Sequence, residues 1–317
     1  MRRAAKVLTL AAAVGAAPIA PSSAAEAVLI RGATVHTVSG RTIEGGSVLL
    51  RDGRIAAVGR SVDAPDAEVV EAAGQHLYPG LIDCDTVLGL VEIPAVRATR
   101  DYSETGEVTP NVRAELAVNP DSELLPVTRA NGILYAYTAP RGGRISGMGA
   151  VMRLDGWTWA DMTVLAPAGL GIQWPRMTID RRPRARTEPE EQEKQREKAL
   201  ETLRDAFDTA RAYLKARDAA AAGEGPPVPV DSRWEAMRPV LSGEVPVVVR
   251  ADDLTQIDAA VAWAEEQGLR LILAGGEDAW RAADLLAEKE IPVLLGPVLS
   301  LPRREWEPYD TAYRNAA

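Results

Sequence analysis

The sequence predicts an α/β protein in which a sheet of βα units follows a smaller β-domain. From residue 80 onward, short apolar runs alternate with segments of helical periodicity, which is typical of βα units and a parallel sheet. Residues 27–79 contain short apolar strands around turn residues instead, and Pro79-Gly80 is a turn signal between the two parts. We therefore expect a β-domain at residues 26–79 and an α/β domain at residues 80–317.

Composition places the chain among soluble globular proteins and excludes several kinds of site. It has 317 residues, of which 46% are hydrophobic and 26% charged. A net charge of −9, without a basic stripe, argues against a nucleic-acid partner. Cys84 is the single cysteine, so an internal disulfide and a cysteine metal cluster are excluded. The two histidines, His36 and His76, both precede residue 80, which argues against a Ser-His-Asp triad in the larger domain.

Residues 1–25 have the features of a secretory signal peptide. Arg2, Arg3 and Lys6 form a basic segment, and an apolar run at residues 7–20 leads to Ser23-Ala24-Ala25. We expect cleavage before Glu26 and a periplasmic or secreted protein. No later stretch is apolar and long enough to predict a transmembrane helix.

The β-domain is predicted from short strands and one hairpin. Residues 47–51 and 54–58 flank Asp52-Gly53, a pair that favours a tight hairpin turn. Further strands are expected at residues 28–38 and 69–70.

The α/β domain contains about seven strand candidates, where a complete (β/α)8 barrel has eight. Besides the stretch after Gly80, the clearest candidates are residues 133–138, 150–154, 245–250, 270–274 and 291–295. Helices are expected at 253–267 and 277–288. The strands end in polar or glycine-rich turns, where the active site of a (β/α)8 barrel lies.

Two segments interrupt this alternation. Residues 141–149 form a glycine-rich loop whose Arg141 and Arg144 could contact an anionic substrate, although a tight connector that needs unusual backbone angles is the favoured explanation of the glycines. Residues 176–230 are an excursion that contains a long charged helix at 188–222, with an apolar stripe that includes Leu203 and Phe207.

The stretch Tyr78–Leu90 carries the most chemical information. Asp83, Asp85 and Val87 are spaced two apart, so on a strand they share one face. Two carboxylates on the inner face of a buried strand are costly unless they are paired or bind something. The alternative is a turn aspartate followed by a solvent-facing one. Cys84 should point the other way and is expected to be a buried, unreactive thiol.

This stretch resembles the first barrel strand of the amidohydrolase superfamily, in particular its imidazolonepropionase-like branch. The family motif reads Pro-Gly-Leu-Ile-Asp-x-His-x-His, and its histidines bind a catalytic metal. In this chain Asp85 and Val87 stand at the histidine positions. The resemblance implies a TIM-like (β/α)8 barrel preceded by a β-sandwich segment, and hydrolysis of carbon–nitrogen bonds other than peptide bonds.

The other metal-ligand positions that the resemblance implies are also substituted. Gly171 stands where we expect the bridging lysine, and Arg250-Ala-Asp252 replaces His-Ala-His. Ala274-Gly-Gly276 replaces Glu-His-Gly, and Ala317 ends the sequence before any match to the last barrel strand. The sequence therefore predicts an incomplete barrel, with a homo-oligomer or a C-terminal partner closing it.

The residues at the substituted metal-ligand positions leave open what occupies the place of the metal. Asp83, Asp85 and Asp252 could hold a hard cation through oxygen. We expect instead that no metal or other cofactor is bound, and that the Arg250 guanidinium pairs with Asp85 or Asp83 at the mouth of the barrel, where Asp252 also lies. A solvent-facing Arg250 is the alternative.

Two functions remain open on the sequence. One is a hydrolase of the family type that is catalytically impaired or metal-independent. The other is a non-catalytic periplasmic protein that keeps the barrel mouth as a small-molecule binding or structural surface.

Overall fold

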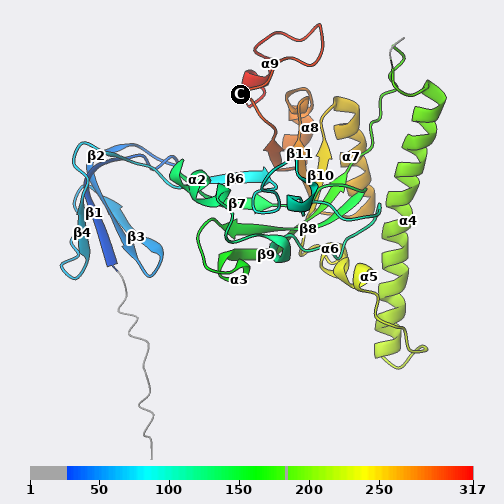
Figure 1. The fold of residues 1–317 in the computed structure, drawn as a ribbon, viewed down its shortest axis with the longest axis horizontal. Coiled ribbons are helices and arrows are strands. Elements are labelled where there is room, and N and C mark those ends of the chain that lie inside the picture. The colour runs from blue at the N-terminus through cyan, green and yellow to red at the C-terminus, as the bar shows by residue number, and fades with distance from the viewer. Residues whose placement is uncertain (1–26, 183–184, 317) are drawn as a thin grey trace, which may run out of the picture. The chain divides into compact units, whose positions relative to one another are not determined.

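The computed structural model describes residues 27–182 and 185–316, so the predicted signal peptide lies outside the described residues. The chain divides between Pro79 and Gly80 into two compact units. Figure 1 labels most of the elements of the two units.

The N-terminal unit contains a five-stranded sheet. Its strands are β1 (Ala27–Val35), β2 (Ile43–Arg51), β3 (Arg54–Gly59), β4 (Glu68–Glu71) and β5 (His76–Leu77). The sheet order is β3-β2-β1-β4, and β5 also pairs with β1. The predicted hairpin is confirmed: Asp52 and Gly53 connect β2 to β3 with positive φ angles of 54° and 70°, as a tight hairpin turn requires.

The larger unit is built on a seven-stranded, barrel-like sheet, which confirms the predicted α/β fold. Its strands follow one another in chain order: β6 (Leu81–Thr86), β7 (Ile133–Thr138), β8 (Ile145–Arg153), β9 (Thr163–Gln173), β10 (Val247–Ala251), β11 (Leu271–Gly275) and β12 (Val293–Leu295). Within the described residues β6 and β12 form the two edges of this sheet. The pairs β6–β7, β9–β10, β10–β11 and β11–β12 are parallel.

Strand β8 corrects the expectation of an all-parallel sheet, because it is antiparallel to both β7 and β9. Only residues 139–144 connect β7 to β8, which is too short for the crossover that a parallel neighbour needs. The predicted glycine-rich loop is correspondingly shorter: Ile145–Gly149 belong to β8 and are buried against β9. Arg141 and Arg144 remain in the connection.

The helices of the larger unit are mostly short. They comprise 3-10 helices η1 (Arg97–Thr99) and η2 (Ala279–Ala282) and the α-helices α1 (Ala114–Ala117), α2 (Leu124–Ala130), α3 (Trp159–Met162), α4 (Pro189–Ala221), α5 (Ser232–Ala236), α6 (Arg238–Leu241), α7 (Leu254–Gln267), α8 (Ala283–Glu288) and α9 (Thr311–Arg314). Helix α7 begins with a capping box between Asp253 and Gln256, which fixes its N-terminus beside the end of β10. None of the helices that the structure describes combines the length and apolar character needed to cross a membrane.

The long helix α4 is the predicted excursion, and it packs along its apolar stripe. Leu203 and Phe207 are fully buried in the main core. The Phe207 ring meets Trp263 of α7 edge-on at 5.1 Å between ring centroids. Figure 1 shows α4 as the longest helix, running beside α7. The excursion is therefore anchored to the helical layer next to β10.

Strand β6 is less buried than its apolar sequence predicts. Leu81 and Ile82 are 60% and 58% exposed. Cys84 is exposed as well, so the expectation of a buried thiol is wrong. The reason is position, because β6 pairs with β7 alone among the described residues and lies at the sheet edge.

Candidate active site

The carboxyl-terminal ends of the strands surround a cleft of about 440 Å³ in the larger unit. Asp85 comes from β6, Arg250 from β10, and Asp252 directly follows β10. Gly275 closes β11, and residues 296–315 supply the rest of the lining. We call this cleft the barrel mouth. Its position at the ends of the strands is where barrel enzymes bind their substrates.

Arg250 and Asp85 form a two-point ion pair at the base of the barrel mouth. The two terminal guanidinium nitrogens of Arg250 each donate to one carboxylate oxygen of Asp85. The side chains are 16% and 22% exposed. Strands β9, β8 and β7 separate β10 from β6 in the sheet, so the pair spans the barrel interior. The ion pair expected from the sequence is confirmed, and Arg250 does not turn outward.

Arg141 is a second cation on the same carboxylate. Its Nη2 donates to Asp85 Oδ1 at 3.2 Å and to the Asp85 carbonyl oxygen at 3.3 Å. Burial, followed by the neighbouring charge of Arg250, lowers the pKa of Arg141. The short β7–β8 connection places Arg141 here, so one carboxylate is shared by two guanidinium groups.

Asp252 is the unpaired acid of the barrel mouth. Among the described residues, no side chain or backbone group forms a hydrogen bond with its carboxylate, and burial raises its pKa. A β-carbon at position 275 would collide with Asp252 Oδ1, and Gly275 has a φ of +94° that favours glycine. The absence of a side chain at Gly275 therefore makes room for the Asp252 carboxylate.

The segment after β12 brings two arginines to acids that follow β11. Arg303 pairs with Glu277 at 2.8 Å, and burial together with the charge of Asp252 raises the pKa of Glu277. Arg304 donates to both oxygens of Asp278, at 2.7 and 3.0 Å. Burial opposes ionisation of Asp278, but the hydrogen bonds from Arg304 and the Leu254 N–H and the charges of Arg304 and Arg281 together outweigh it, so the pKa of Asp278 is lowered. These pairs hold residues 296–315 over the barrel mouth.

The structure brings together three of the four candidate residues expected at the mouth. Asp85, Arg250 and Asp252 line the cleft, whereas Asp83 does not and accepts a hydrogen bond from the Asp85 N–H at 3.2 Å. Of the two expected substrate-binding arginines, Arg141 lines the barrel mouth and Arg144 lines a separate pocket.

Glu277 and Arg303 also line the mouth, and the sequence did not predict either of them there. Glu277 lies in the turn that follows β11. Because such strand-end turns are expected to face the site, this position could have indicated Glu277 as a site residue. Arg303 comes from a segment without regular secondary structure, and no local pattern indicates it.

The side chains gathered at the mouth do not fit a divalent metal. Within residues 27–182 and 185–316, no three His, Cys, Asp or Glu side chains lie close enough to hold a metal ion. Both Asp85 oxygens are taken by guanidinium donors, and Val87 packs in a hydrophobic cluster. Asp83 points elsewhere, which leaves Asp252 as the one unpaired carboxylate among the acids expected to bind a hard cation.

Replacing Asp252 by asparagine should stabilise the protein above acidic pH. The folded-state pKa of Asp252 is raised, so between the unfolded and folded pKa values the folded state holds more protons, and stability falls as pH rises through that interval. The Asp252→Asn variant does not undergo this loss. The difference in free energy of unfolding between the variant and the wild type should therefore grow as the pH rises and then level off. Urea unfolding across the acidic to neutral range measures it.

Asp231→Asn is the control of opposite sign. Arg233 lowers the pKa of Asp231, so this variant should lose stability at neutral pH and approach the wild type as the pH falls. An Asp252→Asn variant that is less stable than the wild type at neutral pH would show that the carboxylate has a stabilising partner.

Comparisons with known proteins agree with this architecture. No protein-family model matches the chain. The chain is 36% identical over 80 residues to a D-hydantoinase of Geobacillus stearothermophilus, a match that covers 25% of this chain and 16% of that protein.

A solved structure supports the fold over most of the chain. The crystal structure of an amidohydrolase from Thermotoga maritima MSB8 superimposes with a TM-score of 0.77 at 27% sequence identity. The match covers 88% of this chain and 72% of that one. Together with the motif at Pro79–Val87, this likeness supports the resemblance of the chain to the amidohydrolase superfamily.

Proposed function

We propose that this amidohydrolase relative is catalytically impaired and that its barrel mouth binds a small polar molecule without a catalytic metal. The observation that carries the proposal is the ion pair of Arg250 with Asp85, two positions at which the resemblance implies metal ligands of the family. Arginine keeps its charge at every physiological pH, and its planar donors match a carboxylate. The guanidinium groups of Arg250 and Arg141 thus supply fixed positive charge where a cation would otherwise be needed.

Charge and geometry also weigh against a metal beside this pair. A divalent cation at the mouth would face two guanidinium groups that already bind Asp85. Such a cation would have to displace Arg250 and leave its charge partly buried without a partner, which costs several kcal/mol by order of magnitude. We expect that metal-activated water is not part of the chemistry of this protein.

The remaining groups of the barrel mouth favour a ligand that both donates and accepts hydrogen bonds. The unpaired Asp252 carboxylate accepts hydrogen bonds, and Arg141 and Arg303 present donors on the same cleft. The volume of about 440 Å³ lies in the range of small-molecule sites. A small amide, with one N–H and one C=O, matches this pattern.

The test is an amide-hydrolysis assay on the purified full chain, with chelator in one arm and added zinc in another. A panel of N-acyl amino acids and small cyclic amides serves as substrate. We expect no turnover in either arm, and binding of some of the compounds in thermal-shift measurements. Turnover that requires zinc and stops on chelation would overturn the proposal.

One observation favours a second function, metal-independent hydrolysis of a carbon–nitrogen bond. Asp252 is unpaired, its pKa is raised, and it lines the mouth, which are the features of a general base. In that case activity should be insensitive to chelation, should increase as the pH rises through the pKa of Asp252, and should be lost in Asp252→Asn. A flat pH profile would exclude Asp252 as the base.

We also propose that the protein is exported. The basic segment, apolar run and small residues within residues 1–25 support this proposal. N-terminal sequencing of the protein recovered from the periplasm or the medium should give a chain that begins near Glu26. Recovered protein that still begins at Met1 would contradict it.

A further inference from the structure

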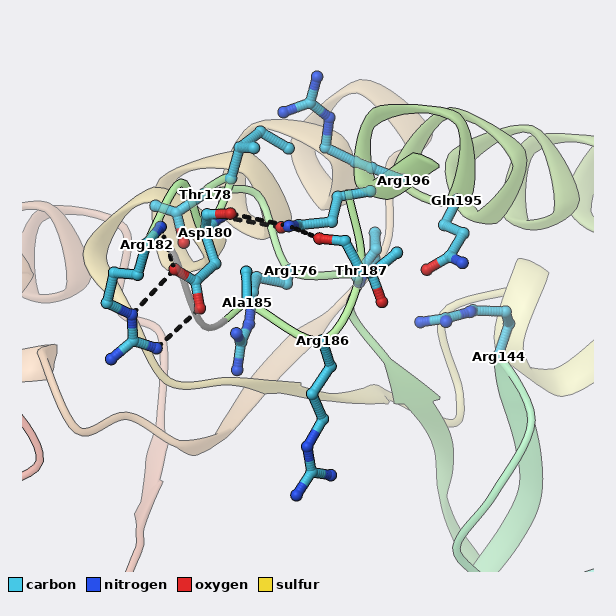
Figure 2. A pocket seen from close by; sticks show the side chains of 13 residues that line it. Arg144, Arg176, Thr178, Asp180, Arg182, Ala185, Arg186, Thr187, Gln195 and Arg196 are labelled. Carbon is cyan, nitrogen blue, oxygen red and sulfur yellow. Dashed lines mark hydrogen bonds and ion pairs between the residues drawn. The ribbon is translucent and has the colours of Figure 1, made fainter. Parts of the chain in front are cut away.

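A second cavity, of about 510 Å³, lies between the start of β8, the loop before α4 and the first turns of α4. Its lining includes Arg144, Arg176, Arg182, Arg186 and Arg196. We call it the arginine pocket. Figure 2 shows these side chains on the lining, with Arg144 on the opposite side from Asp180 and Arg182, and with Arg186 and Arg196 extending to opposite sides in this view.

One carboxylate lines the arginine pocket, and it neutralises one arginine. Asp180 accepts hydrogen bonds from Arg182 Nε at 2.9 Å and Nη2 at 2.7 Å. These bonds lower the pKa of Asp180 to about 2. Among the described residues the pocket lining contains no other acid, so four of its five arginines are not balanced by a carboxylate of the lining itself.

The remaining arginines are held by weak or uncharged partners. Arg196 donates to the Met177 carbonyl oxygen at 2.9 Å. Arg144 donates to the Gln173 carbonyl oxygen at 3.3 Å and reaches Glu107, whose side chain is 67% exposed, only at 3.7 Å. In the part of the chain that the structure describes, Arg176 and Arg186 have no carboxylate within 4.0 Å.

The fold also fixes the loop that carries these charges. The Gln192 side chain accepts from the Asp180 N–H at 2.8 Å and donates to the carbonyl oxygens of Asp180 and Thr187, at 2.9 and 2.7 Å. Gln192 belongs to the first turns of α4, so the loop is bound to a long helix that is itself anchored in the core. Several positive charges are therefore gathered on a supported surface.

We propose that the arginine pocket binds a multiply charged phosphate-class anion, such as a pyrophosphate group. Guanidinium groups meet phosphate oxygens through paired hydrogen bonds, and several of them together favour an anion with more than one negative charge. The cavity is wide enough for more than one phosphate. Since the chain as a whole has a net charge of −9, this positive patch is a local exception that would concentrate anions. The proposal does not depend on what the barrel mouth binds.

The test is isothermal titration of the full chain with inorganic pyrophosphate, and separately with inorganic phosphate, at low ionic strength. Wild-type protein should bind pyrophosphate more tightly than phosphate, and the affinity should fall as salt is added. Arg176→Gln/Arg186→Gln should weaken pyrophosphate binding by about tenfold or more, because the variant loses two charged donors to the anion.

The matched control is Arg97→Gln/Arg204→Gln, which removes the same charge from exposed positions outside the arginine pocket. This control should bind like the wild type, and both double variants should keep the wild-type circular dichroism spectrum. Arg144→Gln provides an independent variant on the other side of the pocket and should also weaken binding. Absence of pyrophosphate binding, equal affinity for phosphate, or equal weakening in the control would each overturn the proposal.

Discussion

Arg250→Ala is expected to lower the free energy of unfolding by about 3 kcal/mol, at the lower end of the range for breaking a buried ion pair. The substitution leaves the Asp85 carboxylate, 22% exposed, with the more distant Arg141 as its remaining charged partner. Partial exposure and this second arginine both reduce the loss. Urea denaturation at neutral pH measures it.

The double variant Arg250→Met/Asp85→Leu should recover much of that loss, because it removes both charges and fills the space with apolar atoms. Arg233→Ala is a control, since Arg233 and its partner Asp231 are 51% and 33% exposed, and its loss should stay under about 1 kcal/mol. A loss in Arg250→Ala no larger than in this control would contradict a structural role for the pair.

Arg304→Ala should be the second large change, with a loss of about 2–3 kcal/mol. The Asp278 side chain is 3% exposed and receives two hydrogen bonds from Arg304, so the substitution leaves a buried carboxylate with only Arg281 and the Leu254 N–H. The same change should release residues 296–315 from the barrel mouth. Limited proteolysis should then cut this segment faster than in the wild type.

Arg303→Ala is the neighbouring control for this effect. Arg303 is 70% exposed and its partner Glu277 is 35% exposed, so we expect a loss under about 1 kcal/mol. Similar losses in both variants, or unchanged proteolysis in Arg304→Ala, would show that Asp278 does not anchor the segment. Because the pKa of Asp278 is lowered on folding, its stabilising contribution should be lost as the pH falls through the folded pKa.

Sequence periodicity correctly predicted those elements in which the local apolar pattern also marks the face that is buried in the fold. Residues 133–138 form β7 as predicted, and the apolar stripe with Leu203 and Phe207 gave the buried face of α4. The direction of β8 was not predicted, because it depends on the length of the connection at residues 139–144 rather than on its composition. The exposure of Cys84 depends on which strand lies at the sheet edge, and a strand pattern does not report that.

The candidate site was predictable where the family motif fixed a position on a strand. Asp85 and Arg250 stand at aligned strand ends, so opposite charge was enough to predict their ion pair. The third partner, Arg141, reaches Asp85 through the β7–β8 hairpin, a long-range contact. The arginine pocket brings Arg144 together with residues of the loop before α4. These residues are far apart in the sequence, so no local pattern predicts that they cluster.

The central claim is that guanidinium groups take the place of the metal centre at the barrel mouth. The direct measurement is the metal content of the full chain, purified without chelators, by inductively coupled plasma mass spectrometry. We predict substoichiometric zinc and other divalent metals, and a melting temperature that does not change on chelation. Stoichiometric metal whose removal lowers the melting temperature would contradict the claim.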